Sequence, residues 1–120
     1  MREQFQEEIN AVTVTLVQMA GLVKVAMENA TTALLTADLA LSEKVIADDA
    51  IVDEIQHELD ARTINLIARQ SPVASDLRTL VSSLRMSADL ERMGDLAHHI
   101  AKSARMRYPA TCLLYTSDAA

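Results

Sequence analysis

Apolar residues recur along most of this chain at alternating steps of three and four positions, the spacing that lines one face of an α-helix. The first such seam holds for about four heptads, which favours packing against other helices at a shallow angle. Its members are Phe5, Ile9, Val12, Leu16, Met19, Val23, Ala26, Ala30 and Ala33. The pattern predicts a helix over about residues 3–36.

Two further seams have the same spacing. The second consists of Leu41, Val45, Asp49, Val52, Gln56, Leu59, Thr63 and Leu66, and the third of Val73, Leu77, Leu80, Leu84, Ser87, Glu91, Gly94, His98 and Ala101. They predict helices over about residues 39–69 and 72–107. Asp38 is expected to cap the start of the second helix. Ser71 and Pro72 suit the cap and first residue of the third, which Pro109 is expected to end.

The connections between these segments are short, so neighbouring helices should run antiparallel. Half of the residues are apolar, while aromatic residues, glycine and proline are all scarce, a composition that favours helices over sheets. We therefore predict an all-α protein, an up-down-up antiparallel three-helix bundle of long helices. The bundle should occupy residues 1–108, followed by a tail over residues 109–120.

The last nine residues, CLLYTSDAA (112–120), resemble the translation of a sequencing-library adapter. The only cysteine, Cys112, lies within them and has no disulfide partner in the chain. We interpret residues 112–120 as non-native and expect the natural sequence to differ beyond about Thr111.

The charge balance excludes some classes of partner. The formal net charge is −6, which disfavours nucleic acid and anionic lipid surfaces as partners. The chain has no run of about 18 uncharged apolar residues, and its first residues lack the layout of a signal peptide. We expect a cytoplasmic protein without direct membrane insertion.

Two pairs of carboxylates interrupt the apolar seams of the second and third helices. Asp49 and Asp53 lie four residues apart, and so do Glu91 and Asp95. A carboxylate is seldom buried unless a partner compensates for its lost hydration. Several oxygen ligands together suit hard or borderline cations. The repeated spacing therefore predicts a metal site formed by these four residues, with His98 as a possible further ligand.

Other interpretations of the same residues remain open. The carboxylates could fix helix register by bonding to an arginine or lysine from a neighbouring helix, for which Arg78, Arg85 and Arg92 are candidates. His98 could equally be a hydrogen-bonded core histidine. Gly94, inside a predicted helix, is typical of a place where something comes close to the backbone.

Two alternative functions also remain. One is a carboxylate-bridged di-iron enzyme, which would need E-x-x-H motifs facing the bundle interior. Glu54 begins such a motif, ending at His57, but the helical phase places it away from the seam. The other is a structural helical oligomer without metal. No phosphate-binding glycine loop and no nucleophile motif is present, so the sequence gives no support to nucleophilic catalysis.

Several strings resemble the PhoU family of phosphate-transport regulatory proteins. They are QSPVASDLR (residues 70–78), LERMGDLA (90–97), IAK (100–102) and, earlier, VIADDAIVD (45–53). Asp76, Arg78 and Gly94 belong to the matching strings. The resemblance covers about residues 1–108. Members of the family are similar to two tandem three-helix bundles, so this chain is interpreted as the N-terminal half.

The resemblance implies a function and a set of partners. It implies iron or zinc ions bound by Asp49, Asp53, Glu91 and Asp95. It also implies a non-enzymatic, cytoplasmic, homodimeric regulator of phosphate uptake and phosphate homeostasis. Such a regulator binds the ATPase of the phosphate ABC transporter and a phosphate-sensing histidine kinase, and represses the phosphate-starvation response. An isolated half should tend to self-associate, because one face of the bundle would be left uncovered.

Overall fold

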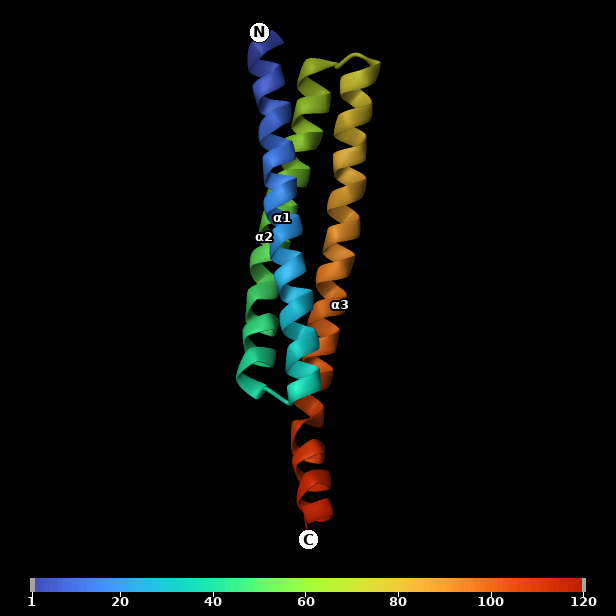
Figure 1. The fold of residues 1–120 in the computed structure, drawn as a ribbon. Helices are drawn as coiled ribbons and strands as arrows, with labels where there is room; N and C mark the ends of the chain where they lie inside the picture. The colour runs from blue at the N-terminus through green and yellow to red at the C-terminus, as the bar shows by residue number, and fades with distance from the viewer. Residues whose placement is uncertain (1, 120) are drawn as a thin grey trace.

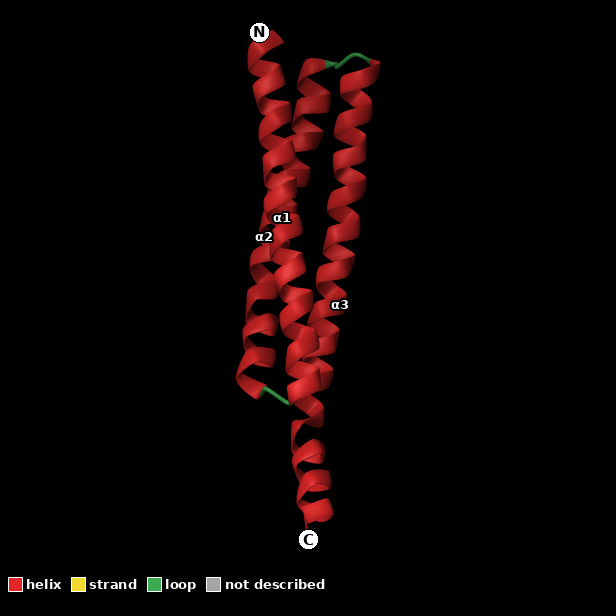
Figure 2. Ribbon diagram, viewed as in Figure 1, coloured by secondary structure: helices red, strands yellow, loops and turns green. Residues whose placement is uncertain are grey.

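The computed structural model describes the backbone of residues 2–119 and the side chains of residues 3–107. Three helices follow one another, α1 (Arg2–Thr36), α2 (Leu39–Gln70) and α3 (Ala74–Ala119). Consecutive helices run antiparallel and lie side by side in a rod of 72 × 18 × 16 Å (Figure 1). Within residues 2–119 everything outside the two short connections is helical (Figure 2). The predicted all-α, up-down-up three-helix bundle is confirmed.

The core follows the predicted seams closely on α1 and α2. Seam residues fill three consecutive clusters along the rod. Large side chains fill the cluster at one end, whose members are Ile9, Val12, Leu16, Leu59, Leu66 and Leu80. The cluster at the other end is built mainly of alanine, with Ala30, Ala97 and Ala101 around Val45. Small side chains let helix axes approach more closely, so the two ends are packed by different means.

The connection between α1 and α2 is the one that the sequence predicts. The carboxylate of Asp38 accepts a hydrogen bond of 3.0 Å from the backbone N–H of Leu41, as an N-cap does. The first helix ends at Thr36, and Ala37 adopts a positive φ of 53° before the chain turns into α2.

The connection between α2 and α3 differs from the prediction. Ser71 does not cap α3 but ends α2 in the left-handed conformation, with φ 44° and its N–H bonded to the carbonyl of Ile67. The ring of Pro72 disfavours the right-handed helical conformation for the residue before it, which ends α2 at this point. The third helix therefore begins at Ala74 rather than at Pro72.

The start of α3 also corrects the predicted third seam. Val73 precedes the helix, and Val73 and Leu77 are 63% and 38% exposed. The interior positions begin at Leu80 and continue through the buried residues Ser83 and Ser87. Ser87 is buried at a predicted seam position, whereas Ser83 occupies an inward position that the predicted seam leaves out.

The end of α3 lies beyond the predicted stop. The helix continues through Pro109 to Ala119 and extends past the end of the bundle (Figure 1). A proline removes one backbone hydrogen bond and destabilises a helix by about 3 kcal/mol, but it allows helical geometry on both sides. The side chains of residues 108–120, including Cys112, lie outside the described part. The adapter interpretation of residues 112–120 stays a prediction.

One helix in the described part of the chain, Glu3–Thr36, is long and apolar enough to cross a membrane by length and composition alone. Core helices of bundles pass the same test. The inward residues of α1, among them Val12, Met19 and Ala30, are buried against the two other helices.

Candidate metal centre

Three carboxylates meet where α2 and α3 face one another. Asp49 and Asp53, one turn apart on α2, and Asp95 on α3 each offer an oxygen, and these oxygens all lie within 4.8 Å of one another. The two α2 residues are half-buried, while Asp95 is exposed. Antiparallel packing brings together residues more than forty positions apart in the sequence, as the predicted convergence of the two pairs requires.

The fourth predicted ligand does not join this group. Glu91 lies one turn before Asp95 and is half-buried, but its carboxylate is outside the cluster of three oxygens. The arginines considered as alternative partners are also elsewhere. Arg92 pairs at 3.9 Å with Asp89 on the outside of α3. Across residues 3–107, no arginine or lysine forms an ion pair with the three clustered carboxylates, so the register interpretation lacks its proposed cation.

His98 contacts the cluster through one of its members. The imidazole Nδ1 lies 2.7 Å from Oδ2 of Asp49, a contact that joins α3 to α2. Both side chains are largely buried, 23% and 13% exposed. Of the two roles that the sequence left open for His98, the structure presents the hydrogen-bonded histidine. The other ring nitrogen, Nε2, is buried and has no partner among the described residues.

The electrostatics of the cluster bear on its chemistry. Burial raises the pKa of Asp53 above its ordinary value, and the negative charges of Asp49 and Asp95 raise it further. The nearby His57 and His98 oppose this shift. The ionised cluster is therefore unfavourable by itself, and a cation placed between the carboxylates would relieve both the desolvation and the repulsion.

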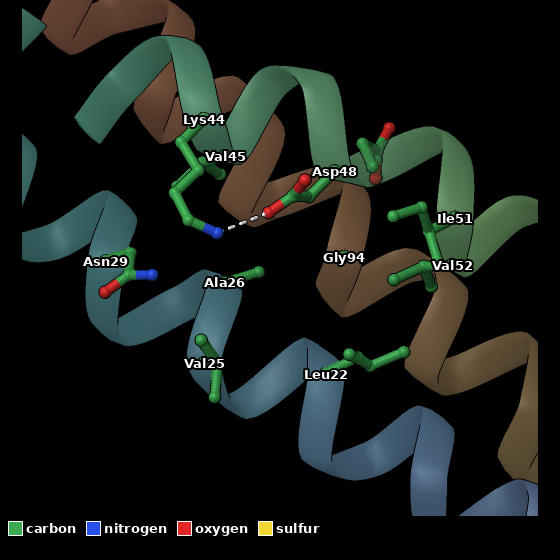
Figure 3. A pocket seen from close by; sticks show the side chains of 11 residues that line it. Leu22, Val25, Ala26, Asn29, Lys44, Val45, Asp48, Ile51, Val52 and Gly94 are labelled. Carbon is green, nitrogen blue, oxygen red and sulfur yellow. Dashed lines mark hydrogen bonds and ion pairs between the residues drawn. The ribbon is translucent and has the colours of Figure 1, made fainter. Parts of the chain in front are cut away.

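A pocket of about 360 Å³ opens beside Asp49, between α1 and α2. Figure 3 shows apolar side chains from α1 and α2 around it, with Gly94 of α3 at its back. An ion pair of 2.9 Å between Lys44 and Asp48 spans part of the rim. Sequence reasoning did not single out Lys44, although its i,i+4 spacing from Asp48 was a visible signal.

Gly94 is buried next to the cluster. A Cβ added to it would meet Oδ1 of Asp49 and Cγ1 of Val52 at 3.7 Å each, and Cγ2 of Val23 at 3.8 Å. These are ordinary van der Waals distances. The helices themselves therefore leave room for a methyl group at this position.

The donor set fits a metal ion. Opposite ligands of a cation with bonds of 2.0–2.4 Å are about 4–4.8 Å apart, and the three oxygens all lie within 4.8 Å of one another. Carboxylate oxygens suit hard or borderline cations. Asp49 and Asp53 would be held by α2, and Asp95 would bind from α3.

The remaining predicted residues lie apart from the cluster. Glu54 is exposed, as its helical phase predicts, and His57 contacts its own helix through Nδ1, 2.7 Å from the carbonyl oxygen of Asp53. Asp76 lies in the first turn of α3, where its charge suits the helix dipole. Arg78 is exposed on the same helix. None of these four residues belongs to the clustered carboxylates.

Comparison with known proteins gives consistent results. Residues 16–104 match the PhoU domain. The phosphate-specific transport system accessory protein PhoU homolog 2 of Mycobacterium tuberculosis is 44% identical over 113 residues, which are 94% of this chain and 53% of the relative. The PhoU homolog of Rhizobium meliloti is 42% identical over 98 residues, which are 82% of this chain and 41% of that protein.

A solved structure agrees in fold. The crystal structure of PhoU from Pseudomonas aeruginosa matches with a TM-score of 0.86 and 33% identity, over 88% of this chain and 51% of that one. The chain spans about half the length, or less, of these relatives. With a domain match over most of its residues and agreement in both sequence and fold, this chain belongs to the PhoU family.

Proposed function

We propose that this chain is a non-enzymatic regulatory module of the phosphate-specific transport system. The support is its membership of the PhoU family and its 44% identity to a relative named as an accessory protein of that system. The chain matches about half of that relative, and we propose that this half takes part in the role for which the relative is named.

The module would hold a metal ion, iron or zinc, on Asp49, Asp53 and Asp95. The observation that carries this proposal is the meeting of three carboxylates from two helices within 4.8 Å, with no arginine paired to them among residues 3–107. The ion would supply positive charge that ties α3 to α2. Glu91, one turn from Asp95, is the nearest predicted residue that could add a fourth carboxylate.

The regulatory step would take place on the outer surface of the bundle. We propose that this surface binds the ATPase of the phosphate ABC transporter and the phosphate-sensing histidine kinase, and that binding represses the phosphate-starvation response. The protein would act in the cytoplasm as a homodimer. The net charge of −6 makes nucleic acid an unsuitable partner.

The metal centre is tested by elemental analysis of the purified protein. The test variant is Asp53→Asn/Asp95→Asn. The matched control is Glu54→Gln/Asp89→Asn, which removes two exposed charges, one from each of the same helices. Stoichiometric metal in the parent and the control, and its loss in the test variant, is the expected result. Equal metal content in all three proteins would show that any bound metal sits elsewhere.

The regulatory role is tested separately in cells. A bacterial strain lacking its own PhoU protein would carry a reporter for the phosphate-starvation response. We expect expression of a full-length relative to lower the reporter signal in high phosphate, and co-purification to recover the transporter ATPase with this chain. A reporter that this chain leaves high, while the full-length relative lowers it, would show that this half is insufficient for repression.

A further inference from the structure

His98 is a largely buried residue of α3 that contacts the carboxylate cluster through Asp49. Its Nδ1 lies 2.7 Å from Oδ2 of Asp49, and its Nε2 is buried without a partner among residues 3–107. No nitrogen of His98 belongs to the set of atoms that lie within 4.8 Å of one another. The ring therefore contacts one of the three carboxylates without joining the group of atoms that they form.

The surroundings of the two ring nitrogens determine which tautomer of His98 suits this position. Nδ1 faces a carboxylate, which only accepts hydrogen bonds when ionised, so Nδ1 must carry a proton. A proton on Nε2 would be a buried donor with no acceptor, and such a group destabilises a fold. The neutral ring with hydrogen on Nδ1 places an unshared lone pair at Nε2 instead. The environment thus favours a ring that donates to Asp49 through Nδ1.

We propose that His98 is a positioning residue for the metal centre rather than a ligand. It donates from Nδ1 to one oxygen of Asp49 and so fixes the orientation of that carboxylate toward Asp53 and Asp95. This inference rests on the proposed metal site. Hydrogen-bonded partners of metal-binding groups hold ligands in place, and losing one typically lowers metal affinity by about 10–100-fold.

Two substitutions separate positioning from ligation. The side-chain NH₂ of asparagine occupies nearly the same place as Nδ1 of histidine, while that of glutamine lies nearer to Nε2. His98→Asn should therefore keep the donor to Asp49, and His98→Gln should lose it. His99→Asn is the matched control, because His99 is the exposed neighbour on the same helix.

The measurement is the dissociation constant for Zn²⁺, by competition with a chelating dye of known affinity. We expect His98→Asn and His99→Asn to stay within about threefold of the parent, and His98→Gln to bind about 10–100-fold more weakly. Thermal unfolding of the metal-free proteins shows whether each variant folds. Equal weakening by asparagine and glutamine in folded proteins would overturn the positioning role and leave the metal centre standing.

A second measurement reads the ring itself. Nitrogen-15 NMR of the parent should show hydrogen on Nδ1 and none on Nε2, both without metal and with Zn²⁺ bound. A Zn²⁺-induced change characteristic of coordination at either nitrogen would make His98 a ligand and overturn the inference. A parent that binds no Zn²⁺, iron or other metal would overturn the proposed metal centre, and the inference with it.

Discussion

A methyl group on Gly94 would lie 3.7 Å from Oδ1 of Asp49, at ordinary contact distance across the interface between α3 and α2. Glycine in the middle of a helix is therefore not forced here by the packing of this chain against itself. It costs helical stability, about 1 kcal/mol relative to alanine. Gly94→Ala should accordingly raise the free energy of unfolding by up to about 1 kcal/mol, measured by urea denaturation.

Gly21→Ala provides the matched control for this substitution. Gly21 is exposed on α1, and no atom lies within 4 Å of its added Cβ, so only helix propensity changes there. Similar gains at both positions are expected. A loss of stability for Gly94→Ala beside a gain for Gly21→Ala would show that Asp49, Val52 and Val23 do not accommodate the methyl group.

Asp53 should give the metal-free protein a distinctive pH dependence. Its pKa is raised in the folded state, so the folded protein binds more protons than the unfolded chain as pH rises above the ordinary value of about 3.8. Stability contributed at this site is therefore lost as pH rises through that window. At neutral pH, in the presence of a chelator, Asp53→Asn should unfold at a higher denaturant concentration than the parent.

The advantage of Asp53→Asn should disappear below about pH 3.8, where the carboxylate is protonated in both states. Glu54→Gln removes the same charge from the adjacent exposed position and serves as the control. If both variants shift the denaturation midpoint equally at every pH, relief of the overall negative charge explains the effect, and the cluster around Asp53 does not.

Ser87 is a buried hydroxyl whose removal should stabilise the bundle. The residue is fully buried on α3, and its Oγ has no hydrogen-bond partner among the described residues. A buried polar group without a partner destabilises the fold by about 1–3 kcal/mol. Ser87→Ala should raise the free energy of unfolding by about 1 kcal/mol more than Ser82→Ala, an exposed control on the same helix. A smaller gain for Ser87→Ala would mean that its hydroxyl finds a partner in solution.

Met19 should contribute strongly to the stability of the core. Its side chain is fully buried and packs with Val23 and Val52. Met19→Ala should lower the free energy of unfolding by about 2–5 kcal/mol through lost burial and a cavity. Val17→Ala, at a position 65% exposed on the same helix, should change it by about 0.5 kcal/mol or less. Comparable losses would place Val17 in an interface formed by association in solution.

The elements that sequence analysis predicted best depend on local patterns. The seam positions of α1 from Ile9 to Ala33 are buried as expected, except for the half-buried Ala26, although the same helix also carries exposed apolar residues such as Val17 and Leu35. The third seam was predicted less accurately, because α3 carries apolar residues outside its buried face and serines within it. Val73 and Leu77 were predicted to face inward and are exposed, while Ser83 is buried at a position that the predicted seam leaves out. Periodicity alone does not choose between such faces.

The sequence predicted which residues belong to the candidate site, but only part of their spatial arrangement. Spacing of four residues places Asp49 beside Asp53 on any helix, and this part needed no tertiary information. Which α3 carboxylate meets them depends on the axial alignment of α2 and α3 and on side-chain rotamers. The sequence offered Glu91 and Asp95 equally, and the structure brings Asp95 into the cluster. The hydrogen bond from His98 to Asp49 depends on the same alignment.

The three carboxylates meet only if α2 and α3 keep their axial alignment. A slide of α3 along α2 by one helical turn moves its side chains by about 5.4 Å, more than the 4.8 Å within which the three oxygens meet. These three oxygens therefore come together only when α2 and α3 are aligned to within less than one helical turn. By thermodynamic reciprocity, any ion that draws the three carboxylates together resists the slide to the same extent that the slide weakens its binding. A partner that shifts α3 along α2 would therefore change the affinity of the three carboxylates for the ion.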